Sequence, residues 1–120
     1  MAINYLLLMF SGLLVGIAAS FTGLGGGFIM VPLLVALGYT AQKAVGTSFL
    51  AILIISLSAV FAHSKFENID YKIAISLGVG GIIGAQIGPY LLEHVSTANF
   101  KKIFSVILVC LAVYLFFQKS

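Results

Sequence analysis

The chain has 120 residues, but only nine are charged: six Lys and three acidic residues, with no Arg. Hydrophobic residues make up 62% of it and the mean hydropathy is +1.22, whereas charged residues alone make up about a quarter of a soluble domain. A small globule cannot bury so much apolar surface, so we expect a lipid bilayer around the chain. This environment excludes most soluble enzymes. Nucleic-acid binding is also excluded, because the few charges form no basic stripe.

The charged residues separate four uncharged stretches, at 1–42, 44–64, 73–92 and 103–118. About 20 apolar residues cross the hydrocarbon core as a helix, so the second and third stretches each predict one crossing. The fourth predicts another if Asn99 and Phe100 contribute to it. We therefore predict an all-α integral membrane protein with about four transmembrane helices and a Gly-broken half-helix. Since no stretch resembles a linker, residues 1–120 are predicted to form a single transmembrane repeat unit.

The first stretch is too long for one crossing, because 42 residues of straight helix measure about 63 Å against a core of about 30 Å. Four glycines within residues 23–27 predict a break, since each costs about 1 kcal/mol in a helix. We expect one crossing over 2–21 and a short helix over 28–38 that Gly38 ends. Three residues are assigned to the break or to hinges: Gly23, Pro32 and Gly46.

The glycine cluster immediately precedes the predicted half-helix. A helix N-terminus presents unpaired N–H groups and a partial positive charge, and glycine lets a ligand approach the backbone. Transporters aim such broken helices at anionic groups. The cluster therefore predicts an anion cradle formed by Gly25, Gly26, Gly27 and the amide of Phe28. The alternative is a sharp turn whose amides are capped by neighbouring helices.

Hydroxyl and amide side chains supply further candidate donors. Thr47 and Ser48 lie just inside the second stretch, where they suit an oxyanion or, alternatively, cap their own helix. Thr22, at the start of the break, is assigned to the same substrate site. Gln86 joins them because an uncharged polar residue inside a membrane span bonds a neighbouring helix or faces a polar cavity.

Small residues recur every four positions on two predicted helices, which lets another backbone approach closely. The packing residues are Gly12, Gly16, Ser76, Gly80, Gly84 and Gly88. His63 and His94 lie at the ends of stretches, where an interfacial imidazole is the ordinary explanation. They are too far apart to indicate a metal site, and Cys110 stands alone in an apolar stretch. We therefore expect neither metal nor cofactor and no enzymatic activity.

Residues 22–34, Thr-Gly-Leu-Gly-Gly-Gly-Phe-Ile-Met-Val-Pro-Leu-Leu, and residues 44–48, Ala-Val-Gly-Thr-Ser, resemble the TauE/SafE family, or sulfite exporter family, of membrane transporters. The resemblance implies a protein of the bacterial or archaeal inner membrane that moves sulfite, thiosulfate or sulfonates. Carried over to matching positions, it points to Gly25, Gly26, Gly27, Pro32, Thr47 and Ser48.

Most members of that family hold two copies of this unit, whereas this chain holds one. A homodimer is therefore predicted, with two half-helices flanking a shared cavity. If the later stretches each cross once, three Lys lie on each side of the membrane, so both parallel and antiparallel pairs remain possible.

No acidic residue lies inside a predicted span, so a proton-coupling carboxylate is missing. We expect facilitated export, since a negative cell interior drives anions outward by about 2.3 kcal/mol per charge per 100 mV. The alternative is a small dimeric anion channel, because residues 80–85, Gly-Gly-Ile-Ile-Gly-Ala, faintly resemble a motif of fluoride channels. A scaffold subunit is the non-transport alternative.

Overall fold

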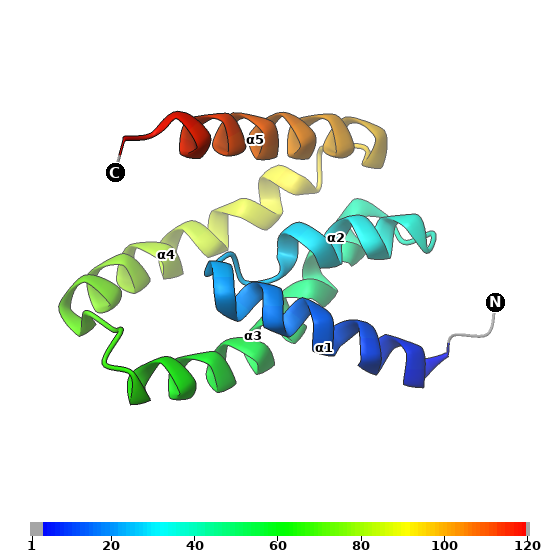
Figure 1. The fold of residues 1–120 in the computed structure, drawn as a ribbon. Coiled ribbons are helices and arrows are strands. Elements are labelled where there is room, and N and C mark those ends of the chain that lie inside the picture. The colour runs from blue at the N-terminus through cyan, green and yellow to red at the C-terminus, as the bar shows by residue number, and fades with distance from the viewer. Residues whose placement is uncertain (1–3, 120) are drawn as a thin grey trace.

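The computed structural model describes residues 4–119, which form five α-helices and no strand (Figure 1). In chain order they are α1 (Tyr5–Thr22), α2 (Gly27–Ala36), α3 (Ala41–Lys65), α4 (Tyr71–Leu92) and α5 (Thr97–Phe117). All but the short α2 are long and apolar enough to cross a membrane. The predicted all-α class, with four spanning helices and one half-helix, is confirmed.

Polar N-caps determine where the four long helices begin. The side chains of Asn4, Thr40, Asp70 and Ser96 each accept the backbone N–H of the residue three positions later. Caps of this kind stabilise the first turn of a helix. For this reason α3, α4 and α5 begin a few residues before the uncharged stretches from which they were predicted. The predicted start of the first helix, at residue 2, lies outside the described residues.

The half-helix α2 ends in the manner expected of Gly38, although two residues earlier than predicted. Leu37 is the C-cap and Gly38 follows it with φ +103°. The N–H of Tyr39 donates to Leu34 O, and that of Gly38 to Val35 O, at 3.1 and 3.0 Å. These two bonds form a Schellman motif, which satisfies carbonyls that the helix end leaves free.

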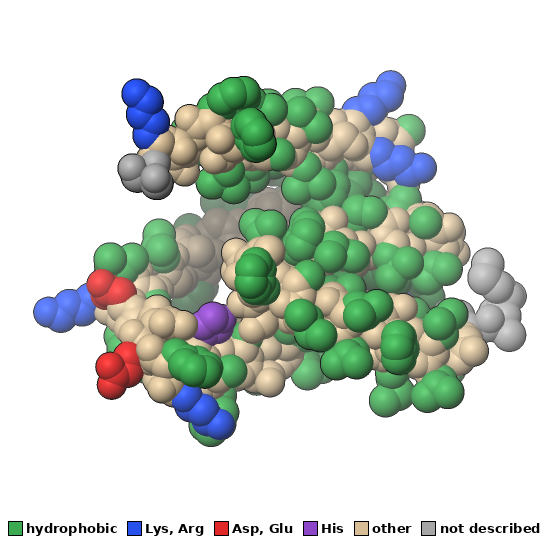
Figure 2. Space-filling model, viewed as in Figure 1, with side chains coloured by type: hydrophobic (Ala, Val, Ile, Leu, Met, Phe, Trp, Pro, Cys, Tyr) green, Lys and Arg blue, Asp and Glu red, His purple; other side chains and the backbone are tan. Residues whose placement is uncertain are grey.

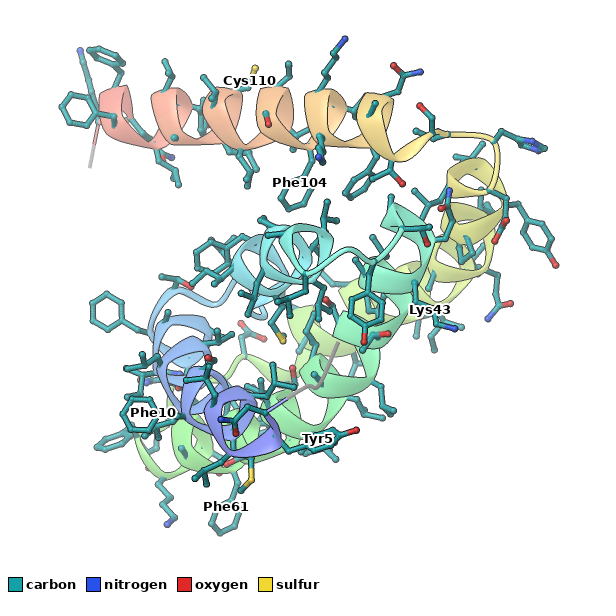
Figure 3. The ribbon with its side chains drawn as sticks, turned by 90° about the vertical axis from the view of Figure 1, so that its right-hand side faces the viewer. Tyr5, Phe10, Lys43, Phe61, Phe104 and Cys110 are labelled. Carbon is teal, nitrogen blue, oxygen red and sulfur yellow. The ribbon has the colours of Figure 1, made fainter. Side chains whose placement is uncertain are left out.

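Helices α1, α2 and α3 form the packed part of the described chain. Helix α2 packs most extensively on α3, α1 also contacts α3, and α1 and α2 run in opposite directions (Figure 1). Six side chains from these helices are buried: Val15, Ala19, Val31, Ala41, Ala44 and Ser48. By contrast, α4 and α5 bury no residue. In Figure 3, Phe104 points from α5 toward α2, while Cys110 points away from the other helices.

Hydrogen bonds tie the start of α3 to the turn between α4 and α5. The side-chain Nε2 of Gln42 donates to Leu92 O at 2.9 Å and to Val95 O at 2.8 Å. Next to it, the backbone N–H of Ala41 donates to Thr97 Oγ1 at 3.0 Å. The α4–α5 turn is therefore held by polar contacts rather than by a shared apolar core.

Charged side chains lie toward the ends of the molecule, with hydrophobic side chains between them (Figure 2). The glycine stripes face open space. A Cβ built on any of Gly12, Gly16, Gly80, Gly84 or Gly88 would meet nothing within 4 Å, and Ser76 is exposed. Contact of these stripes with another helix therefore stays a prediction.

Candidate functional site: the glycine loop and the cleft beside it

The connection between α1 and α2 is a loop that only glycine adopts readily. Gly23, Gly25 and Gly26 have φ angles of +78°, +77° and +84°, in the left-handed region where a side chain is strained. The break therefore occurs where the sequence predicts it. The loop turns the chain back on itself, so that α2 starts beside the last turns of α1.

Close packing adds a second reason for glycine at Gly26, which is buried. A Cβ there would lie 3.0 Å from Val15 Cγ1 and 3.2 Å from Met30 Cε. On the opposite side, Cβ atoms built on Gly25 and Gly27 would meet Ile52 of α3 at 3.6 and 3.4 Å. The loop is thus held between α1 and the middle of α3.

Helix geometry gives the depth of this loop. The α3 backbone rises about 17 Å from Ala41 to Ile52, at 1.5 Å per residue. Helix α2, which leads from the loop back toward the start of α3, has ten residues and rises about 15 Å. Both lengths are about half of a 30 Å hydrocarbon core. The loop therefore lies near the middle of the spanning region.

The N-terminus of α2 differs from the other four helix starts because no side chain caps it; Gly26 is the N-cap. The carbonyl of Gly26 accepts the N–H groups of Ile29 and Met30 at 3.1 and 2.9 Å. The amides of Gly27 and Phe28 precede them, at the positive end of the helix dipole. No acidic residue lies in this first turn. A helix start with free amides and no acidic residue is favourable to a nearby anion.

The predicted hydroxyls do not all gather at this helix start. Ser48 is only 1% exposed, and its Oγ has no hydrogen-bond partner among the described residues. It lies one turn from Ile52 toward the start of α3, away from the glycine loop. Thr47 is exposed. The Thr22 hydroxyl is used locally, since it donates to Ala18 O at 2.7 Å and accepts the N–H of Leu24 at 3.3 Å.

The remaining predicted residues lie elsewhere. The side chains around the loop come from α1, α2, α3 and the α3–α4 connection, whereas Gln86 is exposed on α4. Pro32 is exposed within α2, and Gly46 faces open space on α3. The structure thus brings together Gly23, Gly25, Gly26 and Gly27, and leaves Gln86 apart from them.

A cleft of about 240 Å³ lies beside the loop, and sequence reasoning missed it. It is lined by Ala19, Ser20, Gly23, Gly25, Ile55, Ser56, Ala59, Val60, His63, Asn68 and Ile69. The α3 residues among them follow helical spacing, so they share one face of α3. Sequence reasoning could have found Ser56 and His63 from this spacing, but it did not use it.

His63 holds the outer wall of this cleft together. Its Nε2 lies 2.9 Å from Ser20 O, and Asn68 Nδ2 lies 3.1 Å from its Nδ1. The carbonyl oxygen of Ser20 only accepts, so Nε2 of His63 carries the proton of that bond. His63 therefore joins the end of α1 to the α3–α4 connection, a role that the expectation of an ordinary interfacial imidazole did not include.

Residues 8–120 match the protein family described as "Sulfite exporter TauE/SafE". The probable membrane transporter protein MJ0441 of Methanocaldococcus jannaschii is 32% identical over 116 residues, which cover 91% of this chain and 43% of that protein. YunE of Bacillus subtilis, also called a probable membrane transporter protein, is 31% identical over 120 residues, covering 93% and 44%.

The chain thus spans less than half the length of these curated relatives. No solved structure matches it. The family match extends from the second turn of α1 to the end of α5, and so includes the glycine loop and every helix. This chain therefore belongs to the sulfite exporter TauE/SafE family of membrane transporters and is a multi-pass membrane protein.

Proposed function

We propose that this chain is one repeat of a transporter that exports small sulfur-containing anions, such as sulfite, thiosulfate or sulfonates, across the cell inner membrane. The observation that carries the proposal is the start of α2. Three left-handed glycines leave a helix N-terminus without a side-chain cap at about half the depth of the bilayer. A helix end can exist there only if it is buried in protein or lines a polar cavity.

In this mechanism the anion is held by backbone amides rather than by a charged side chain. The N–H groups of Gly27 and Phe28 provide donors and the dipole of α2 provides partial positive charge. Helix α2 contains no Lys or Arg, so binding is weak and release is fast. A membrane potential that is negative inside then drives net export without a coupled proton.

In this proposal two copies of the chain pair as a homodimer, with their half-helices flanking a shared cavity. The exposed glycine stripes support the pairing, because they are surfaces on which two helices can pack closely and rock. Thr22, Thr47, Ser48 and Gln86 stay predicted contacts of the substrate elsewhere along the path, because none of their side chains is available at the start of α2 in this structure.

Sulfite efflux from loaded proteoliposomes tests this proposal. Gly26→Val should abolish efflux, because a branched side chain at a buried left-handed position displaces the start of α2. The matched control is Gly78→Val on α4, where an added Cβ meets nothing within 4 Å. Both variants are first checked for helical content and elution volume in detergent. Efflux that persists in well-folded Gly26→Val contradicts the proposed site, and no efflux from the wild-type protein contradicts the function.

A further inference from the structure

The cleft beside the glycine loop is lined by uncharged groups. Among its lining residues the polar side chains are Ser20, Ser56, His63 and Asn68, and none is a carboxylate, a lysine or an arginine. Its volume of about 240 Å³ is many times the roughly 10–15 Å³ that a single water needs on the same measure. The cleft therefore has room for a small, partly hydrated solute and contains no carboxylate that would repel an anion.

Two hydroxyls in this cleft are free to donate. Elsewhere in the described helices, five hydroxyls donate to a carbonyl of their own helix at 3.0 Å or less, those of Ser11, Thr22, Ser64, Ser76 and Ser105. Ser20 and Ser56 are half-buried and line the cleft from α1 and α3. Their hydroxyls make no hydrogen bond to any residue within 4–119. Each keeps an O–H donor for a solute between the two helices.

His63 fixes the distance between these two helices. Its Nε2–H donates to the backbone carbonyl of Ser20 itself, and its other ring nitrogen accepts from Asn68. Since both ring nitrogens are used, the imidazole positions Ser20 instead of contacting the solute. Ser20 of α1, Ser56 of α3 and Gly25 of the loop thus line the same cleft.

We infer that this cleft binds a small oxyanion, with the Ser20 and Ser56 hydroxyls as direct donors and His63 as a positioning residue. The inference rests on the proposed function and adds a binding region next to the start of α2, because Gly23 and Gly25 of the loop line the cleft whereas Gly27 and Phe28 do not. It places the anion between α1 and α3, on the side of the loop that leads to the α3–α4 connection. The hydroxyl donors to the anion are then Ser20 and Ser56, in place of Thr47 and Ser48.

Binding to the full-length protein in nanodiscs tests the inference, with sodium sulfite as the probe and titration calorimetry as the measurement. Ser20→Ala and Ser56→Ala should each weaken sulfite binding about tenfold or more, because each removes a hydrogen bond to a charged group. The matched control is Ser58→Ala, an exposed serine on the same helix that does not line the cleft. It should bind sulfite as the wild type does.

A positioning role for His63 has its own readout. His63→Gln keeps an N–H donor for Ser20 O and should retain most of the affinity, whereas His63→Phe should lose it while remaining folded by helical content and elution volume. Wild-type affinity in both serine variants overturns the inference and leaves the proposed function standing if efflux persists. Wild-type protein that neither binds nor transports sulfite overturns both.

Discussion

A Cβ on Gly26 would lie 3.0 Å from Cγ1 of Val15, closer than a relaxed contact allows, so the start of α2 rests directly on α1. The same position has φ +84°. Gly26→Ala should therefore lower the free energy of unfolding by about 2 kcal/mol, from overpacking and from left-handed strain. Thermal unfolding in detergent measures it.

The control substitution should change the free energy of unfolding in the opposite direction. Gly78 lies within α4 with nothing near its added Cβ, so Gly78→Ala should raise stability by about 1 kcal/mol through helix propensity. Equal effects at the two positions would contradict the packing described for the glycine loop.

Ser48 is a buried hydroxyl with no partner in the described chain. Removing such a group relieves a desolvation cost, so Ser48→Ala should leave stability unchanged or raise it by about 1 kcal/mol. Chemical denaturation in detergent, with exposed Ser58→Ala as the reference, provides the measurement. Marked destabilisation would mean that the Ser48 hydroxyl has a partner in the folded protein.

Gln42 donates to two carbonyls at the α4–α5 turn. Gln42→Leu should destabilise the protein by about 1–3 kcal/mol, because the part-buried carbonyls of Leu92 and Val95 lose their donor. Hydrogen exchange should show faster exchange of amides in that turn. The comparison is Gln86→Leu, an exposed amide in α4, which should leave the turn unchanged.

The hydrogen-bonding roles of the two His63 ring nitrogens are directly observable. In the protein labelled with ¹⁵N-histidine, the Nδ1 resonance should have the shift of an unprotonated nitrogen, and Asn68→Leu should shift it by removing the bonded amide. His94, exposed near the α4–α5 turn, gives the reference signal in the same spectrum. A ring with no proton on Nε2 would contradict the bond to Ser20 O.

Much of the fold follows from local sequence features. The charges locate the long helices, the glycine cluster locates the break, and Gly38 ends α2 through its own backbone conformation. The starts of the long helices depend on caps such as Thr40 and Ser96, which lie outside the uncharged stretches. Local chemistry therefore predicts the elements, and capping adjusts their bounds.

The cleft depends on tertiary register, which composition and spacing do not encode. Ser20 and His63 are far apart in sequence and meet because α1 packs against α3. The same register places Ile52, rather than Ser48, against Gly25 and Gly27. Sequence reasoning identified hydroxyls of the right chemistry on α3, but it could not tell which turn of that helix meets the loop.

The short length of α2 also determines how much of the membrane voltage would act on an anion at the glycine loop. A monovalent anion at the glycine loop, about 15 Å below one surface, has crossed about half of the bilayer and hence about half of its voltage drop. That fraction corresponds to about 1.15 kcal/mol per 100 mV, or about a sevenfold change in occupancy. An added or deleted turn of α2 would change this voltage sensitivity without altering a single ligand of the anion.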